Sequence, residues 1–366
     1  MVCSAAVLSS SLALSLLRHS SSPSQSFVLS PFSLNSALSI VHDGANGNTQ
    51  KELTNLLLNG CTPADVTNHY SSLTLSLPSN NDTGVSFKSA NRFYVDNSIS
   101  LKNEYQKHVE EKYKVKVQGL KLGNKVDAAK EMNTFVDEAT NGMIRDFIKA
   151  NGISDEAKSI LINAIHFLGT WKNSFDKKKT TKGNFHGAKG DKEVEFMNNN
   201  AHFNISHTEI GVTLVLPYEN EVFRFFLVMP AEERNLENLR SELTGEKLQS
   251  ILKNTHSRKV ELSLPKFSLS SDLDGVKVLQ KLGVNNIFDN TADFTKVRIS
   301  DTPLKVSKIQ HKAVVEVDEK GTVAAAATSI EMVFKSAVIN NKVIINRPFL
   351  FGILNKDDIL FIGQFA

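Results

Sequence analysis

The segment from Glu319 to Thr328 holds the residues of this chain best suited to function, because their types suit a backbone that must adopt two conformations. After Glu319-Lys320, Gly321 relaxes the backbone restriction at the base of the segment, and only small side chains follow it. The chemistry open to such a segment is main-chain hydrogen bonding: it can form an exposed loop, or it can slide between two strands and become a strand. As a strand it would place Thr322, Ala324, Ala326 and Thr328 on one face and Val323, Ala325, Ala327 and Ser329 on the other.

A helix is the alternative for this segment. Alanine is the best helix former, and four consecutive alanines taken alone indicate a helix. The neighbouring residues favour strands instead. A β-rich run covers residues 313–317, and two further apolar stretches follow, one after Pro348 up to Leu354 and one at residues 361–366.

The elements that must position this segment alternate between helical and strand patterns. The spacing predicts helices over residues 32–58 (broken at Gly44 and Gly47), 105–113, 126–144 and 236–252. It predicts strands over residues 87–95, 160–167, 212–216, 225–229, 260–264, 343–345, 349–354 and 359–362. The interleaving indicates an α+β protein with several mainly antiparallel sheets. No linker long enough to separate domains interrupts it, so one domain is expected over residues 1–366.

Composition excludes several classes of function. The hydrophobic fraction of 41% and charged fraction of 22% are ordinary for a globular protein, and the net charge of +3 is too small to indicate a nucleic-acid partner. The densest basic patch, Lys177-Lys178-Lys179, is predicted to be a solvated turn. No apolar run approaches membrane-spanning length. The chain contains no Gly-x-Ser-x-Gly, His-Glu-x-x-His or phosphate-binding glycine loop, so we expect no enzyme, no metal and no cofactor.

The N-terminus and the cysteines bear on location. Residues 1–17 are apolar enough to suggest a signal peptide, but this segment has no Lys or Arg before its apolar part, and serines interrupt that part. Leucines recur at helical spacing at Leu8, Leu12 and Leu16. The two cysteines, Cys3 and Cys61, form no disulfide framework, and we expect isolated thiols in a reducing compartment. These features predict a cytoplasmic protein without a signal peptide.

An ordered series of short motifs covers nearly the whole chain, and with it the chain resembles the serpin family. The series comprises Ser30-Pro31-x-Ser33, Gly44-Ala45-x-Gly47-x-Thr49, Asn91-Arg92-Phe93-Tyr94, Asn133-Thr134-Phe135-Val136, Thr140-Asn141-Gly142-x-Ile144, Asn163-Ala164-Ile165-His166-Phe167-x-Gly169-x-Trp171, Leu216-Pro217-Tyr218, Leu264-Pro265-Lys266-Phe267, Leu282-Gly283-Val284, Ala292-Asp293-Phe294, Val306-Ser307 and His311-Lys312-Ala313. The segment 319–328 and the Pro348-Phe349 strand complete it. The short start resembles the intracellular, ovalbumin-like branch, and a nematode or other invertebrate member would fit.

The resemblance implies a fold of three β-sheets and eight or nine helices, with an exposed reactive-centre loop at about residues 319–342. The first helix of that fold ends shortly before Ser30, so cleavage of a signal peptide would remove it. The resemblance also implies two sites on the main sheet. At the "shutter" the strands part to admit the loop, and the matching residues are Ser30, Ser33, Asn163 and His311. At the "breach" insertion begins, and the matching residues are Trp171, Lys266 and Glu319.

The activity that the resemblance implies is suicide inhibition of an endopeptidase. The protease supplies its own nucleophile, and residues Glu319 to Thr328 form the hinge that inserts after cleavage. Family spacing puts the reactive bond at Lys335-Ser336, which indicates a trypsin-like target. The stretch after Ser336 is longer than in common members, so cleavage near Met332, Val333 or Phe334 by a chymotrypsin-like enzyme or a cysteine cathepsin is the alternative. A non-inhibitory binding member is a further alternative. Residues 52–87 contain no Lys or Arg, so no heparin site is expected, and we expect a monomer.

Overall fold

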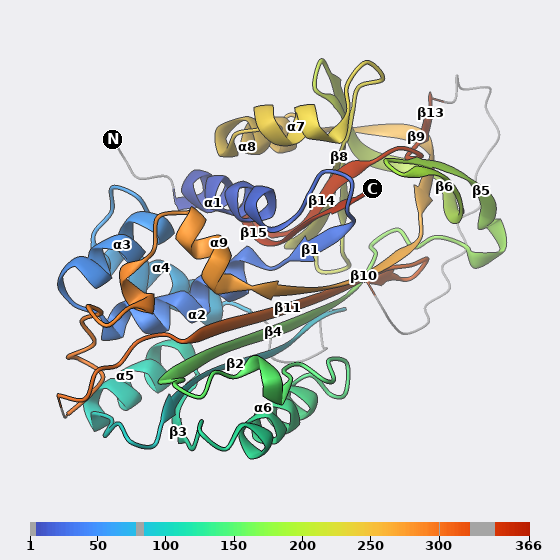
Figure 1. Cartoon of the computed structure of the whole chain (residues 1–366). Coiled ribbons are helices and arrows are strands. Elements are labelled where there is room, and N and C mark those ends of the chain that lie inside the picture. Colours follow the sequence, from blue (N-terminus) through green and yellow to red (C-terminus); the bar gives the residue numbers. More distant parts are fainter. Residues whose placement is uncertain (1–4, 78–83, 300, 323–340) are drawn as a thin grey trace.

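The computed structural model describes residues 5–77, 84–299, 301–322 and 341–366 (Figure 1). Within these ranges it contains nine α-helices: α1 (Ala5–Ser20), α2 (Pro31–Gly44), α3 (Gly47–Leu57), α4 (Pro63–Leu75), α5 (Asn103–Tyr113), α6 (Lys125–Ala139), α7 (Leu236–Glu242), α8 (Gly245–Lys253) and α9 (Gly275–Lys281). The strands are β1 (Phe27–Leu29), β2 (Val85–Asp96), β3 (Lys116–Leu120), β4 (Ser159–Thr170), β5 (Thr181–Gly187), β6 (Gly190–Thr208), β7 (Gly211–Pro217), β8 (Phe223–Pro230), β9 (His256–Pro265), β10 (Phe267–Asp274), β11 (Lys308–Val317), β12 (Gly321–Thr322), β13 (Asn341–Ile344), β14 (Phe349–Asn355) and β15 (Asp358–Phe365).

A six-stranded sheet forms the middle of the molecule. Its strand order is β10-β11-β4-β2-β3, and the short strand β12 pairs with β4. The central pair, β11 and β4, is parallel, whereas β2 and β10 pair antiparallel with their neighbours β4 and β11. Helix α6 covers one face of the sheet and α2 lies on the other (Figure 1). Because both faces are covered, β4 is buried along nearly its whole length, as its apolar run predicts.

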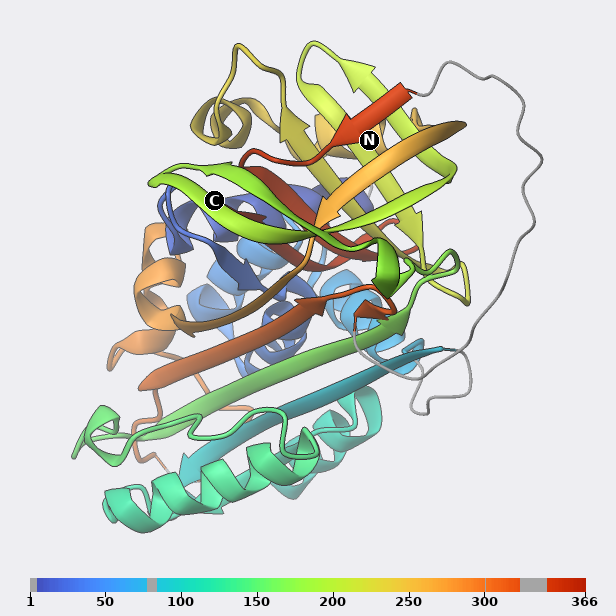
Figure 2. The same cartoon turned by 90° about the vertical axis from the view of Figure 1, so that its right-hand side faces the viewer.

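The second sheet has nine strands and lies above the six-stranded sheet in Figure 2. The resemblance implies three sheets, but two of them are hydrogen-bonded into one here. The reason is β6, a strand of 19 residues. Its first part pairs with β5, its later part pairs with β7, and β9 pairs along most of its length. One long strand therefore joins what would otherwise be two separate sheets.

Helix α2 lies between the two sheets and is buried almost throughout. Ser30 caps its N-terminus by accepting a hydrogen bond from the Ser33 amide, and Pro31 occupies the first turn, where no amide donor is needed. The helix ends at Gly44. Its two ends lie in different surroundings: the start packs against the middle of the six-stranded sheet, and the end lies among α3, α4 and α5.

Three sequence-based expectations are wrong in detail. The helix predicted over residues 236–252 is two helices, because Thr244 accepts a hydrogen bond from the Lys247 amide and starts α8 as a new helix. The helix predicted over residues 126–144 ends at Ala139, because Asn141 and Gly142 have φ angles of 52° and 77°. Cys61 is disulfide-bonded, so it is not the isolated thiol that we expected.

Candidate functional site

Ser30, Ser33, Asn163 and His311 lie together at the centre of the six-stranded sheet, although 281 residues separate Ser30 from His311. All four are fully buried. Asn163 on β4 is directly opposite His311 on β11, and its Oδ1 is hydrogen-bonded to the His311 Nδ1. The Asn163 amide nitrogen donates to the Ser33 carbonyl at 3.0 Å and to the Ser33 hydroxyl at 2.5 Å. The four side chains thus tie both central strands to α2.

The hydrogen bonds identify the tautomer of His311. The Ser30 amide donates to Nε2 at 3.1 Å, so Nε2 carries no proton, and Nδ1 must be the donor to Asn163. Burial lowers the pKa of His311 to about 3, in agreement with a neutral ring. His311 therefore accepts from one element and donates to another, as a neutral connector between α2 and the two strands.

Asn91 on β2 also belongs to this cluster, and sequence reasoning missed its role. Its Oδ1 accepts a hydrogen bond from the Asn163 amide nitrogen, and it is opposite Asn163 in the β2–β4 pairing. The signal was present, because Asn91 is a polar residue inside a predicted strand and part of a motif of the series. Without the strand register, however, nothing in the sequence assigns it to Asn163.

Lys266 and Glu319 meet beyond the end of β11. They lie at the end of the sheet that holds Thr170, the last residue of β4, and we call this end the upper end. Their charged atoms are 3.1 Å apart, and the Glu319 side chain is only 7% exposed. The Thr180 hydroxyl donates to the same carboxylate at 2.8 Å. Burial raises the pKa of Glu319, but the hydrogen bonds from Thr180 and Lys266 outweigh it and hold that pKa below its usual value. Glu319 is thus held ionised at the start of the segment that sequence analysis singled out.

Trp171 fixes the backbone of the same segment. Its indole nitrogen donates to the Asp318 carbonyl at 2.9 Å, and its amide donates to the Lys320 carbonyl at 2.9 Å. The indole is stacked on Tyr218, with ring centroids 4.7 Å apart and an interplanar angle of 9°. Sequence reasoning expected Trp171 near Glu319, and the structure brings both to this point. It did not foresee Tyr218 or Thr180 as their supports.

Beyond Lys320 the chain forms a short strand at the end of the six-stranded sheet. Gly321 and Thr322 form β12, which pairs antiparallel with Thr170 and Gly169 of β4. Gly321 has a φ of 148°, and a Cβ at this position would lie 1.9 Å from the Gly169 carbonyl oxygen. Only glycine allows so close an approach of the two backbones. The glycine is therefore required by contact with β4 as well as by flexibility.

Directly below this point β4 has a different neighbour. Residues Ile160 to His166 pair with Lys308 to Val314 of β11, so no strand lies between them. His166 is fully buried, and neither ring nitrogen has a hydrogen-bond partner among the described residues. Burial lowers the pKa of His166 to about 4. The end of β4 at Gly169 and Thr170 thus pairs with β12, and the rest of the strand from Ile160 to His166 pairs with β11.

The remaining predicted site residues lie outside the described residues. They are the hinge residues Val323, Ala324, Ala325, Ala326, Ala327 and Thr328, and the residues at and near the reactive bond, Met332, Val333, Phe334, Lys335 and Ser336. In the part of the chain that is described, no group of three or more His, Cys, Asp and Glu side chains could hold a metal ion. No helix of that part is long and apolar enough to span a membrane.

Comparison with known proteins finds similarity over the whole of this architecture. A family model described as serpin (serine protease inhibitor) matches residues 8–366. The chain is 33% identical to Iris of Ixodes ricinus over 344 residues, which cover 92% of this chain and 90% of Iris. It is 32% identical to Serpin B6 of Pongo abelii, over 94% of this chain and 93% of that protein. Among solved structures, the thermophilic serpin tengpin in its native state superposes with a TM-score of 0.90 at 26% identity, over 98% of this chain and 93% of tengpin.

Proposed function

Because the chain belongs to the serpin family of serine protease inhibitors, we propose that it traps a trypsin-like serine endopeptidase that attacks the bond between Lys335 and Ser336. The chain acts as an inhibitor and contributes no catalytic group. The protease serine attacks the Lys335 carbonyl, the bond to Ser336 breaks with release of the Ser336 amine, and an acyl-enzyme forms. The freed segment from Gly321 onward then enters the six-stranded sheet between β4 and β11.

The pairing of β12 with β4 is the observation that supports insertion most directly. Each further residue of the segment would pair with the residue one earlier in β4, because antiparallel partners run in opposite directions. Ala326 would then lie opposite Ile165, and Thr328 would lie opposite Asn163. Met332 would reach Ser159, the first residue of β4. The inserted strand would span the whole of β4, about 40 Å at roughly 3.3 Å per residue.

This register gives each polar cluster a role in the proposal. Lys266, Glu319 and Trp171 hold the base of the loop at the breach, where entry begins. Ser30, Ser33, Asn163 and His311 form the shutter, where the bond between Asn163 and His311 must open before the strand passes. Opposite residues of an antiparallel pair point to the same face, so the Thr328 hydroxyl would reach the space that this bond leaves.

Insertion also provides the free energy for trapping. The new strand gains backbone partners on both sides, and a dozen hydrogen bonds at roughly 0.5–1.5 kcal/mol each contribute on the order of 10 kcal/mol. With Lys335 three residues beyond Met332, the attached protease would be carried past the lower end of β4. The uncleaved form is kept from this state by a kinetic barrier.

Cleavage mapping tests the proposal. Incubation with trypsin should give a covalent complex that survives SDS, and mass spectrometry should find the new end at Lys335. Lys335→Ala should abolish reaction with trypsin, because the acidic specificity pocket then lacks its partner. Lys342→Ala, in the described part of the region that follows, is the matched control and should react normally.

Other outcomes of the same experiment separate the alternatives. Cleavage after Met332 or Phe334 with chymotrypsin or a cysteine cathepsin, together with loss of that enzyme's activity, would replace the trypsin-like target. Complete cleavage by every protease without a complex, and with no rise in melting temperature, would contradict inhibition and indicate a binding protein.

Domain organisation, oligomeric state and location complete the proposal: a single domain over residues 1–366, a monomer, no nucleic-acid, membrane or heparin partner, and a cytoplasmic location with the N-terminus uncleaved. Burial of Leu12, Leu16 and Leu17 of α1 in the core supports an uncleaved N-terminus, because removal of α1 would expose the core residues that pack against these leucines. The Cys61 disulfide argues for an oxidising compartment instead. N-terminal sequencing of the protein from its own cells distinguishes the two.

A further inference from the structure

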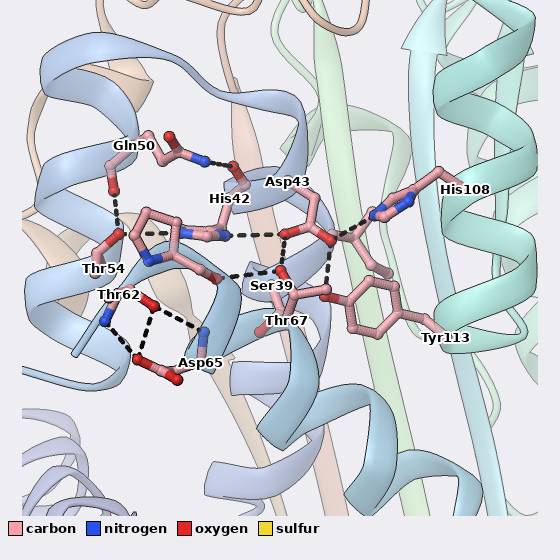
Figure 3. Close-up of polar contacts among 12 residues, drawn as sticks. Ser39, His42, Asp43, Gln50, Thr54, Thr62, Asp65, Thr67, His108 and Tyr113 are labelled. Atoms are coloured by element: carbon pink, nitrogen blue, oxygen red, sulfur yellow. Dashed lines mark hydrogen bonds and ion pairs between the residues drawn. The ribbon is translucent and has the colours of Figure 1, made fainter. Parts of the chain in front are cut away.

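A buried carboxylate lies at the end of α2 that is remote from the shutter. Asp43 is the last residue but one of this helix, and its side chain is 6% exposed. Its Oδ1 accepts from the His42 Nδ1 at 3.0 Å and from the Thr67 hydroxyl at 2.6 Å. Its Oδ2 accepts from the His108 Nε2 and from the Tyr113 hydroxyl, both at 2.9 Å (Figure 3). We call these five residues the Asp43 cluster.

The charge of Asp43 is satisfied by these donors. Burial raises the pKa of the Asp43 carboxyl, but hydrogen bonds from His42, Thr67 and His108 outweigh it and lower that pKa below its usual value. Loss of one donor would leave a buried carboxylate short of a partner. Hydrogen bonds to charged groups are stronger than those between neutral ones, so the cluster holds its elements together firmly.

The cluster joins three helices. Thr67 belongs to α4, and His108 and Tyr113 belong to α5. A further bond joins the same helices, because the Tyr105 hydroxyl of α5 donates to the Ile40 carbonyl of α2 at 2.6 Å. The α2 helix is thus held against α4 and α5 at its C-terminal end.

The start of α2 is bonded to both central strands of the six-stranded sheet, because Asn163 of β4 donates to Ser33, whereas α5 is bonded to β3 alone. The start of α2 is fixed to β15 by the Ser30 hydroxyl, which donates to the Leu360 carbonyl at 2.6 Å, and to β11 by His311. Helix α5 leads directly into β3, and the Gln106 side chain donates to the Val117 carbonyl of that strand at 3.0 Å. Once Asn163 releases Ser33, α2 is held at its start by β15 and β11, and its contact with α5 then connects the β11 side of the sheet with the β4-β2-β3 side.

Insertion of a strand between β4 and β11 separates these two sides by about 4.8 Å, the spacing of neighbouring strands. A hydrogen bond cannot lengthen by that distance and persist. If α2 stays with β11 and α5 moves with β3, the bonds of Asp43 to His108 and Tyr113 must break. We propose that the Asp43 cluster is a latch that resists separation of β4 from β11 and thereby slows loop insertion. This inference rests on the proposed insertion mechanism.

The experiment compares Asp43→Asn with Asp65→Asn in the full chain. Asp65 lies in the first turn of α4, where it accepts from the Thr62 amide at 2.8 Å, and it is exposed. The two variants make the same chemical change on neighbouring helices. The measurement is the rate at which uncleaved protein loses inhibitory activity on warming while it becomes resistant to denaturation, which reports insertion without cleavage.

Asp43→Asn should raise this rate by roughly tenfold or more, since it removes the charge that all four donors share. Asp65→Asn should change it less than about twofold, as expected of an exposed cap. The melting temperature of the loop-cleaved form should be the same for Asp43→Asn and wild type, because the latch is already released in that form.

Equal lowering of the melting temperature in the uncleaved and cleaved forms, without faster loss of activity, would show that Asp43 only supports the fold. If Asp43→Asn fails to fold, Tyr113→Phe removes one donor and keeps the ring, and it should still speed the loss about threefold. An unchanged rate in that variant overturns the proposal. If cleavage does not raise the melting temperature of the wild type, the insertion mechanism itself has failed, which is a separate result.

Discussion

The upper and lower parts of β4 differ in what they face on the β11 side. At Gly169 and Thr170 the neighbour is β12, and the approach is so close that a Cβ on Gly321 would meet the Gly169 carbonyl. From Ile160 to His166 the neighbour is β11, and a buried polar cluster at Asn163 ties both strands to α2. In the proposed mechanism these two parts of β4 have different roles. We call Gly169 and Thr170 with β12 the entrance, and Ile160 to His166 with β11 the closed part. The proposed insertion proceeds from the entrance to the closed part.

The largest expected effect comes from blocking passage between the two parts. Ala326→Arg would place an unpaired charge opposite Ile165, whose side chain is fully buried in the core between the sheets. Insertion should stop there, so the variant should be cleaved by the target protease without trapping it. The number of inhibitor molecules consumed per trapped protease should rise at least about tenfold.

Asn340→Arg is the control for this substitution. It makes a similar change beyond the proposed reactive bond, where the proposed mechanism requires no insertion, and should leave trapping intact. A stable covalent complex with Ala326→Arg would refute the register derived from β12.

The second-largest effect is expected from weakening the polar cluster that holds β4 to β11. Asn163→Ala removes the partner of the His311 Nδ1 and of the Ser33 and Asn91 oxygens. Each buried group left without a partner costs about 1–3 kcal/mol. The uncleaved form should lose roughly 3 kcal/mol or more of unfolding free energy, measured by urea denaturation, and should convert faster to the inserted form. Asn200→Ala, at an exposed position of β6, should change neither quantity; equal behaviour of the two variants would remove the special status of Asn163.

A pH titration tests the difference between the two parts of β4, because the buried histidines His166 on β4 and His311 on β11 both lie where these two strands pair and not at β12. Burial lowers the pKa of His311 to about 3 and that of His166 to about 4, whereas an unfolded histidine titrates near pH 6.5. As the pH falls, the unfolded state thus binds the proton before the folded state does. The contribution of the two neutral histidines to the free energy of unfolding is therefore complete above about pH 6.5 and is lost below it. Lowering the pH from 7 to 5 should therefore reduce the free energy of unfolding of the uncleaved form by about 2 kcal/mol for each histidine.

His166→Leu should remove about half of this pH dependence and should also raise stability at pH 7 by about 1 kcal/mol, because the ring has no hydrogen-bond partner in the described part of the chain. The measurement is urea denaturation at pH 5, 6 and 7. His202→Leu, an exposed position on β6, serves as the comparison and should keep the full slope. A wild-type stability that stays constant from pH 7 to pH 5 would contradict the assignment.

The smallest effect belongs to the entrance. Lys266→Gln removes the ion pair with Glu319, but the Lys266 side chain is 32% exposed, so the loss should stay below about 1 kcal/mol. Burial lowers the pKa of Lys266, but Glu319 outweighs this effect and raises that pKa. The contribution of protonated Lys266 to stability is therefore lost as the pH rises above 10.5. The pKa of Glu319 is lowered, so its share is lost as the pH falls below 4.5. The difference in unfolding free energy between variant and wild type should therefore be constant from about pH 5 to pH 10. A loss as large as that of Asn163→Ala would contradict the expectation that the entrance contributes less stability than the closed part.

Sequence reasoning recovered most of the elements and missed features that depend on contacts. The apolar run at residues 160–167 is β4, and the periodic leucines near the N-terminus belong to α1. The break between α7 and α8 was missed, because the Thr244 cap is a single hydrogen bond inside an otherwise helical pattern. The disulfide of Cys61 was missed, because pairing depends on the distance between two cysteines and not on their number.

The sequence by itself determined the class of the fold, the family and the composition of the hinge, because periodicity, turn residues and side-chain size act within a few residues of one another. Only the tertiary structure decided that Gly321 meets Gly169, that Asn91 joins Asn163, and that Asp43 collects donors from two other helices. These are contacts between residues far apart in the chain. Strand register and burial create them, and a buried polar group obtains its partner only when the chain has folded around it.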